Sequence, residues 1–160
     1  MPRGNGVRSF LARLPWRYVL GFYCTKEPVR NFAMRNRVLI VDDCPYVADA
    51  SARLIAVCGY EARTAYDGHE AIERAKTFAP DLVLMDIGMP RVNGYDAAAA
   101  IRREPRNSNV LLVAVTCYDH EQDKLRALAS GFDLHIPKPV SLSTLHKVLS
   151  LLHQRADEGS

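Results

Sequence analysis

Strand-like and helix-like hydrophobic patterns alternate five times between residues 36 and 155, and this alternation constrains the fold more than any other feature of the chain. The strands are expected at residues 37–42, 60–65, 81–86, 110–116 and 132–136. The first, third and fourth are almost continuously apolar, as strands are when helices cover both faces of their sheet. The alternation therefore predicts an α/β domain with a parallel sheet.

The segment after the first strand predicts a helix with a defined start and end. Pro45 is tolerated in the first turn of a helix, and Gly59 suits the left-handed residue that ends one. Between them, apolar side chains recur on one helical face, at Val47, Ala50, Leu54 and Val57. Such a stripe usually packs against the core.

Four more helices are expected. Asp67 with Glu70 three residues later resembles a capping box at the start of the second, and Pro80 separates that helix from the third strand. The next two are expected at residues 95–103 and 119–130. Ser141 can cap the last one, whose apolar residues recur at helical spacing: Leu145, Val148, Leu149 and Leu152.

Polar side chains stand at, or just past, the ends of four strands: Asp42 and Asp43, Asp86, Thr116 and Lys138. Because the carboxyl ends of parallel strands line one crevice, these residues are expected in a single pocket. Mg²⁺ prefers oxygen ligands, and a cation offsets the repulsion among crowded carboxylates. The pattern therefore predicts a Mg²⁺ site formed by the three aspartates.

The same pocket suits the transfer of a phosphoryl group onto a carboxylate. Asp86 is the candidate nucleophile, because carboxylates can form aspartyl-phosphate intermediates. Lys138 offers a compact cation to the phosphoryl oxygens, and Thr116 offers a hydroxyl donor. Pro139 follows Lys138, and a cis bond between them would let the loop aim the lysine at the pocket.

Charge is distributed unevenly along the chain. Residues 1–35 carry seven Lys/Arg and one acid, whereas residues 36–160 carry fourteen Lys/Arg and seventeen acids. The body is therefore mildly acidic although the whole chain has a net charge of +3. Nucleic-acid binding by the body is not expected.

The four cysteines show neither a metal-binding spacing nor a disulfide framework, which favours reduced thiols in the cytosol. Cys44 and Cys117 flank the expected pocket and are interpreted as small buried side chains, with redox sensitivity as the alternative. No apolar run approaches the roughly twenty residues needed to cross a bilayer. A cytoplasmic location without a membrane span is expected.

Four motifs together resemble the receiver domain of two-component response regulators, the family of the bacterial chemotaxis regulator. They are VLIVDD at residues 38–43, LVLMDIGMPRVNGYDAA at 82–98, the Thr116 that ends VLLVAVT, and PKP at 137–139. The resemblance covers residues 36–155. It implies a flavodoxin-like, doubly wound α/β fold, with five helices around a five-stranded parallel sheet in the order 2-1-3-4-5.

The resemblance also implies roles for the pocket residues. Asp86 would accept a phosphoryl group from the phosphohistidine of a partner histidine kinase or histidine phosphotransfer protein. Asp43 would bind Mg²⁺ directly and Asp42 would bind it through water, while Gly88 would add its carbonyl oxygen as a further ligand.

A second implied set of residues forms the switch: Thr116, His135 and Pro139. Thr116 would move to bond the phosphoryl group, and the side chain behind it on the fifth strand would rotate inward. That side chain is His135, where many members of the family have Phe or Tyr. Phosphorylation would thereby shift a two-state equilibrium of the domain.

Two positions predict a long-lived phosphoryl group. Gly88 has no side chain to orient an attacking water, and the bulky Tyr118 could shield the acyl phosphate. A lifetime that is unchanged in Gly88→Asn would contradict this explanation.

The expected function is a stand-alone phosphorylation switch, not an enzyme with an external substrate, although phosphoryl transfer and dephosphorylation would be self-catalysed. Only a short tail at residues 156–160 follows the domain, so output is expected through an unknown protein target. The resemblance is also compatible with a phosphorylation-dependent dimer.

Other functions remain open. The chain could be a detached receiver of a hybrid histidine kinase in a phosphorelay, or a scaffold that never takes phosphate. A phosphatase with an aspartyl intermediate is disfavoured, because Ile87 and Gly88 supply no second acid beyond Asp86.

Residues 1–35 do not join the strand–helix alternation. They are basic, with an apolar patch at residues 16–23. Three interpretations are open: a disordered tail, a basic element that binds a membrane or a partner, or a segment absent from the native protein. Met34 directly precedes the segment RNRVLIVDD (residues 35–43), where a minimal domain of this kind would begin. Translation is therefore hypothesised to start at Met34, and the intact mass of the natively expressed protein tests this.

Overall fold

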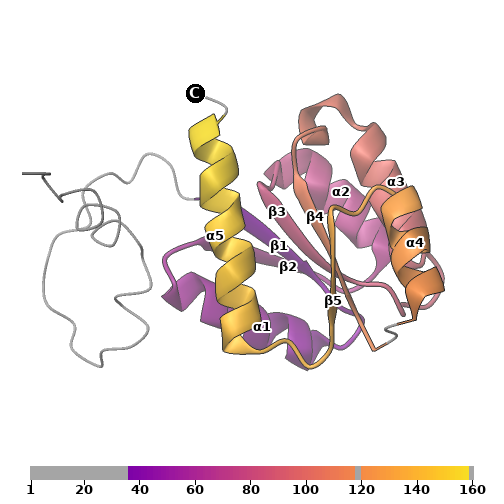
Figure 1. Ribbon diagram of the computed structural model, residues 1–160, viewed down its shortest axis with the longest axis horizontal. Helices are drawn as coiled ribbons and strands as arrows, with labels where there is room; N and C mark the ends of the chain where they lie inside the picture. Colours follow the sequence, from indigo (N-terminus) through magenta and orange to yellow (C-terminus); the bar gives the residue numbers. More distant parts are fainter. Residues whose placement is uncertain (1–35, 118–119, 159–160) are drawn as a thin grey trace, which may run out of the picture. The chain divides into compact units, whose positions relative to one another are not determined.

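The computed structural model describes residues 36–117 and 120–158, which form a parallel sheet covered by helices on both faces (Figure 1). The sheet order is β2-β1-β3-β4-β5, and every neighbouring pair is parallel. This confirms the predicted doubly wound fold and its strand order. The strands are β1 (Arg37–Val41), β2 (Glu61–Ala65), β3 (Leu82–Asp86), β4 (Leu111–Thr116) and β5 (Leu134–Pro137).

The helices alternate with the strands as predicted. They are α1 (Pro45–Val57), α2 (Gly68–Phe78), α3 (Gly94–Arg103), α4 (Glu121–Ala129) and α5 (Leu142–Glu158), with a short 3-10 helix, η3 (Pro105–Asn107), before β4. Helices α2, α3 and α4 cover one face of the sheet, and α1 and α5 cover the other (Figure 1). No helix in the described part of the chain is both long and apolar enough to cross a bilayer. The expected basic extension at residues 1–35 lies outside the described residues.

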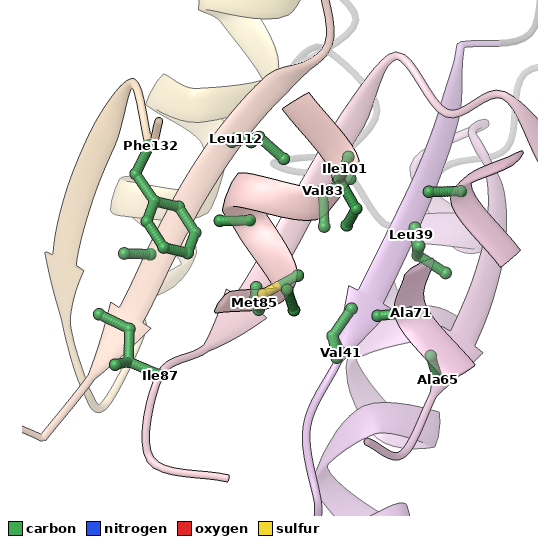
Figure 2. Close-up of a cluster of buried hydrophobic side chains, with 14 of the residues drawn as sticks. Leu39, Val41, Ala65, Ala71, Val83, Met85, Ile87, Ile101, Leu112 and Phe132 are labelled. Carbon is green, nitrogen blue, oxygen red and sulfur yellow. The ribbon is translucent and has the colours of Figure 1, made fainter. Parts of the chain in front are cut away.

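The central strands β1, β3 and β4 send alternate side chains into two separate cores. On the α2–α3–α4 face, Leu39 of β1 and Met85 of β3 belong to a cluster that extends to Phe132, just before β5 (Figure 2). The opposite core combines the remaining strand residues with the inner sides of α1 and α5, including Val38, Ile40, Leu84, Ile55 and Leu149. Burial on both faces explains why the central strands are continuously apolar.

The helix ends follow the predicted signals. Asp67 Oδ1 accepts a hydrogen bond of 2.8 Å from Glu70 N, and Ser141 Oγ accepts one of 3.1 Å from Thr144 N. Gly59 has a φ of +94°, the left-handed conformation that commonly ends a helix. The starts of α2 and α5 and the end of α1 are therefore set by local residue preferences.

The apolar stripe noted in the sequence of α1 does not face the core, so that interpretation was wrong. Val57 is 86% exposed, and Val47 and Leu54 are also exposed. The buried side of α1 is instead built on Ala48 and Ile55. Ala52 packs on the same side, and residues 48, 52 and 55 also recur at helical spacing. Helical spacing alone did not distinguish the two stripes.

Candidate functional site

The five residues predicted to share a pocket all lie at the carboxyl edge of the sheet. Asp42 and Asp43 follow β1, Asp86 ends β3, Thr116 ends β4, and Lys138 follows β5. One carboxylate oxygen from each of the three aspartates lies within 4.8 Å of the other two. The fold therefore brings the predicted carboxylates into one cluster.

Lys138 lies between two of these aspartates. Its Nζ donates hydrogen bonds of 2.9 Å to Asp42 Oδ2 and 2.9 Å to Asp86 Oδ2. Its backbone N–H donates to Thr116 O at 2.8 Å, and the Lys138–Pro139 peptide bond is cis.

The charge on Lys138 is stabilised by this arrangement. Partial burial alone would lower the pKa of Lys138, because desolvation disfavours the ammonium form. The hydrogen bonds to Asp42 and Asp86 and their negative charges outweigh that effect, so the pKa lies above its ordinary value. Lys138 is therefore a fixed cation beside Asp86 at neutral pH.

Backbone N–H groups hold the remaining oxygens of two carboxylates. Cys44 N donates to Asp42 Oδ1 at 2.9 Å, and Gly88 N donates to Asp86 Oδ1 at 3.0 Å. Asp42 is only 5% exposed, whereas Asp43 is exposed to solvent. Asp42 and Asp86 are thus fixed at both oxygens, and Asp43 is the carboxylate most open to a ligand from solution.

The donor set fits a hard divalent cation. In the described part of the pocket, three carboxylates stand against one ammonium, which leaves two negative charges in excess. Every ligand atom offered is an oxygen, the type that Mg²⁺ prefers. The backbone of Gly88 lies beside this cluster through its N–H, and the use of its carbonyl as a ligand stays a prediction.

The expected switch residues lie on neighbouring strands. In the β4–β5 register, Ala114 pairs with His135 and Thr116 pairs with Pro137. Thr116 is 1% exposed, and both ring nitrogens of His135 are buried without a hydrogen-bond partner. Pro139 is exposed. The movement of Thr116 and His135 stays a prediction.

The two cysteines beside the pocket are not buried. Cys44 and Cys117 are both exposed free thiols, so their interpretation as buried apolar side chains was wrong. The cause is their position just past a strand end, where the chain turns out of the core. Tyr118, which was expected to shield a phosphoryl group, lies outside the described residues.

The sequence did not predict one hydrogen bond, which joins the residue after β2 to α1. Tyr66, directly after β2, donates a hydrogen bond of 2.8 Å from its hydroxyl to Asp49 Oδ1 on α1. Neither residue belongs to a motif noted above, and they are seventeen positions apart. Only the strand order, which places β2 beside β1, could have suggested this contact.

Comparisons with known proteins agree with this architecture. A family model described as the response regulator receiver domain matches residues 38–150. The protein PilH of Pseudomonas aeruginosa is 32% identical over 114 residues, which span 71% of this chain and 94% of PilH. The DNA-binding dual master transcriptional regulator RpaA of Synechocystis is 29% identical over 121 residues, or 76% of this chain. The matched region spans only 50% of the length of RpaA.

A solved structure shows the same likeness at the level of the fold. It is the receiver domain of a Pseudomonas aeruginosa sensor histidine kinase, with a magnesium ion coordinated in its active-site cleft. Its TM-score is 0.68 at 25% identity, and the alignment covers 74% of this chain and 98% of that one. Because the family match takes in most of the folded body, this chain belongs to the family of response regulator receiver domains, which act in two-component signalling.

Proposed function

We propose that this chain is a phosphoacceptor switch whose Asp86 takes a phosphoryl group from a histidine kinase or a histidine phosphotransfer protein. The observation that carries the proposal is the position of Asp86 in the three-carboxylate cluster, 2.9 Å from Lys138 Nζ. A structural ion pair would need one carboxylate for one lysine. The two additional carboxylates favour a site for a cation and a phosphoryl group.

Mg²⁺ would be held by Asp42, Asp43 and Asp86. When bound, it would neutralise negative charge on the incoming phosphoryl group. In the transfer, a carboxylate oxygen of Asp86 forms a bond to phosphorus while the P–N bond of the phosphohistidine breaks. The electron pair of that bond stays on the imidazole nitrogen. Lys138 would donate to the phosphoryl oxygens, and Gly88 N would keep the Asp86 carboxylate oriented.

The response to phosphorylation would be a shift between two conformations of the domain. The Thr116 hydroxyl would bond the phosphoryl group, and the buried His135 ring would follow on the neighbouring strand. The changed surface would then bind a protein target. In this proposal the chain has no external substrate, and it takes and loses its own phosphoryl group.

The direct test is incubation of the full chain with a small phosphodonor and Mg²⁺, followed by intact mass. A phosphoryl adduct is expected that needs Mg²⁺ and disappears in Asp86→Asn. Asp133→Asn is the matched control, because Asp133 lies at the opposite edge of the sheet and should not affect the adduct. An adduct that persists in Asp86→Asn would refute the assignment, and no adduct from a folded chain would favour the scaffold function.

A phosphorelay role is the second candidate, because the similar receiver domain described above belongs to a sensor histidine kinase. Transfer of the phosphoryl group from Asp86 to a histidine phosphotransfer protein would support this role. Failure of that transfer, with the adduct intact, would favour a switch that acts by binding alone.

The lifetime of the phosphoryl group can be tested at Gly88. A Cβ added there would lie 3.6 Å from Asp86 Oδ1, an ordinary contact, so a side chain fits beside the carboxylate. Gly88→Asn is expected to shorten the lifetime, because its amide can orient a water toward the phosphorus. The decay of the adduct, measured by mass in wild type and variant, checks this expectation.

A further inference from the structure

The turn between β2 and α2, taken together with the first residue of α2 (residues 66–68, the β2–α2 turn), carries none of the pocket residues. It nevertheless contacts α1, which follows Asp43, and the segment that follows Asp86. We propose that Tyr66 and its partner Asp49 are positioning residues that hold the acid pocket in the geometry needed for metal binding. The chemistry of the pocket rests on the function proposed above, but the role of Tyr66 can be tested separately.

The first contact fixes the segment that carries Asp43. On one side of this segment, Asp42 N donates to Ala65 O at 3.2 Å, which extends the β1–β2 pairing by one residue. On the other side, the Tyr66 hydroxyl donates to Asp49 Oδ1 at 2.8 Å, in the second turn of α1. The exposed Asp43 and its neighbour Cys44 are thus bracketed by two bonds to adjacent residues of β2 and its turn.

Tyr66 is itself held in place by its neighbours. Its hydroxyl accepts a hydrogen bond of 3.1 Å from Thr64 Oγ1, and its backbone N–H donates to Glu70 Oε2 at 2.8 Å. Glu70 is in turn paired with Arg74. The ring of Tyr66 therefore has little freedom, and its bond to Asp49 can fix α1 relative to β2.

The second contact involves the segment that follows Asp86. Gly68 is buried against Val92, and a Cβ added at Gly68 would lie 2.7 Å from Val92 Cγ1, which is too close for a real side chain. Arg91, next to Val92, has a φ of +66°, an unusual backbone conformation for a residue other than glycine. The β2–α2 turn thus packs directly on the segment that follows the phosphoacceptor.

The two contacts give the turn a role in the geometry of the pocket. Asp43 comes from the segment held by Tyr66 and Asp49, and Asp86 comes just before the segment that packs on Gly68. Metal binding requires both carboxylates at a fixed separation, because Mg²⁺ demands nearly ideal geometry. Loosening Tyr66 should therefore weaken metal binding even though Tyr66 does not touch the metal.

The test is Mg²⁺ binding to the full chain, measured by isothermal titration calorimetry without any phosphodonor. Tyr66→Phe and Asp49→Ala are expected to raise the Kd for Mg²⁺ about threefold, less than the roughly tenfold that follows removal of a group bonded directly to a metal ligand. Asp49→Asn keeps a side-chain oxygen acceptor and is expected to recover most of the affinity. Asp133→Asn, at the opposite edge, should leave the Kd unchanged.

A second readout needs no metal. In the metal-free chain, the backbone amide NMR signals of Asp43 and Cys44 should shift in Tyr66→Phe, and those of Gly131 should not. An unchanged Kd and unchanged Asp43 signals in both Tyr66→Phe and Asp49→Ala would overturn the proposal. Absence of Mg²⁺ binding by the wild type would instead refute the proposed function, and the amide signals would still decide the role of Tyr66.

Discussion

Both edges of the sheet hold a cation that pairs with at least one carboxylate, but the balance of charge differs between them. At the carboxyl edge, Lys138 is shared by Asp42 and Asp86, with Asp43 close by. At the opposite edge, the guanidinium of Arg102, at the end of α3, pairs with Asp133 at 3.0 Å. It also donates to backbone carbonyls that precede β4 and β5: those of Ser108 and Val110 at 2.9 Å, and that of Gly131 at 2.8 Å.

The difference distinguishes a structural contact from a binding site. Around Arg102, one cation meets one carboxylate, and neutral carbonyls accept its other hydrogen bonds. Asp133 also accepts a hydrogen bond of 2.8 Å from Leu112 N, so the cluster is satisfied by the protein itself. Around Lys138, the described residues offer one ammonium for three carboxylates, and the proposed Mg²⁺ would balance the excess negative charge. The effect of Mg²⁺ on stability should therefore separate the two edges.

The largest expected effect is at Arg102. Arg102→Met should lower the free energy of unfolding by about 2–3 kcal/mol, because it leaves several carbonyls and the carboxylate of Asp133 without this partner. Urea denaturation should give the same loss with EDTA and with Mg²⁺. Arg103→Met is the control, since Arg103 is exposed and should change stability by less than about 0.5 kcal/mol. A loss of stability in Arg102→Met that depends on Mg²⁺ would contradict the assignment of the Arg102 cluster as a structural contact.

A pH effect is expected from Tyr60, which lies at the same edge as Arg102, just before β2. Burial, and to a lesser extent the charge of Cys58, raise the pKa of Tyr60 to about 12 from 10.0. The folded state thus holds this proton more tightly than the unfolded state does. The resulting stability is fully present below pH 10 and is lost as the pH rises from 10 to 12.

The loss should be on the order of 2 kcal/mol. Urea titrations of wild type and Tyr60→Phe across this pH range would measure it as the difference between the two curves. If the free energy of unfolding fell equally with pH in the two proteins, the phenol of Tyr60 would not titrate with the expected shift.

A smaller and conditional effect is expected at Lys138. In EDTA, Lys138→Met should lower the free energy of unfolding by about 1–2 kcal/mol, because Asp42 and Asp86 lose their shared cation. Because the pKa of Lys138 is raised on folding, its contribution is present at neutral pH and is lost only when the pH rises through that raised value. Mg²⁺ should restore most of the stability of the variant at neutral pH. An equal loss with and without Mg²⁺ would make Lys138 a structural residue like Arg102.

The smallest effect is expected at Asn107 in η3. This side chain is 1% exposed, and neither its amide nitrogen nor its oxygen has a hydrogen-bond partner. Asn107→Leu should raise the free energy of unfolding by about 1 kcal/mol, because an unpaired buried polar group is replaced by an apolar one of similar size. A lower stability would instead reveal a partner for the amide, such as an ordered water.

The comparison of the edges also explains what could be predicted from the sequence. The carboxyl-edge pocket was predictable because the sheet is parallel, and any polar residue that ends a strand must lie at that edge. The Arg102 cluster was not predictable, because most of its acceptors are backbone carbonyls, which every residue possesses. The sequence of a parallel-sheet domain therefore predicts which polar side chains share the carboxyl edge. It does not predict which backbone carbonyls accept hydrogen bonds from an arginine.

The error at α1 has a different cause. Ala48 and Ile55 on one side, and Val47, Leu54 and Val57 on the other, give two apolar stripes on one helix. Which stripe is buried depends on how the helix rotates about its axis over the sheet. That rotation is fixed by contacts with other elements, which the local sequence of α1 does not contain.

The exposed stripe of α1 has a consequence for how such a domain can diversify. Val57 is 86% exposed and Tyr46 is 87% exposed, so replacing them changes the stability of the fold very little, whereas Ile55 is fully buried. The fold therefore constrains substitutions on the buried side of the helix far more than substitutions on the exposed side. The exposed side of α1 could therefore vary in sequence while the pocket residues that precede the helix kept the same arrangement.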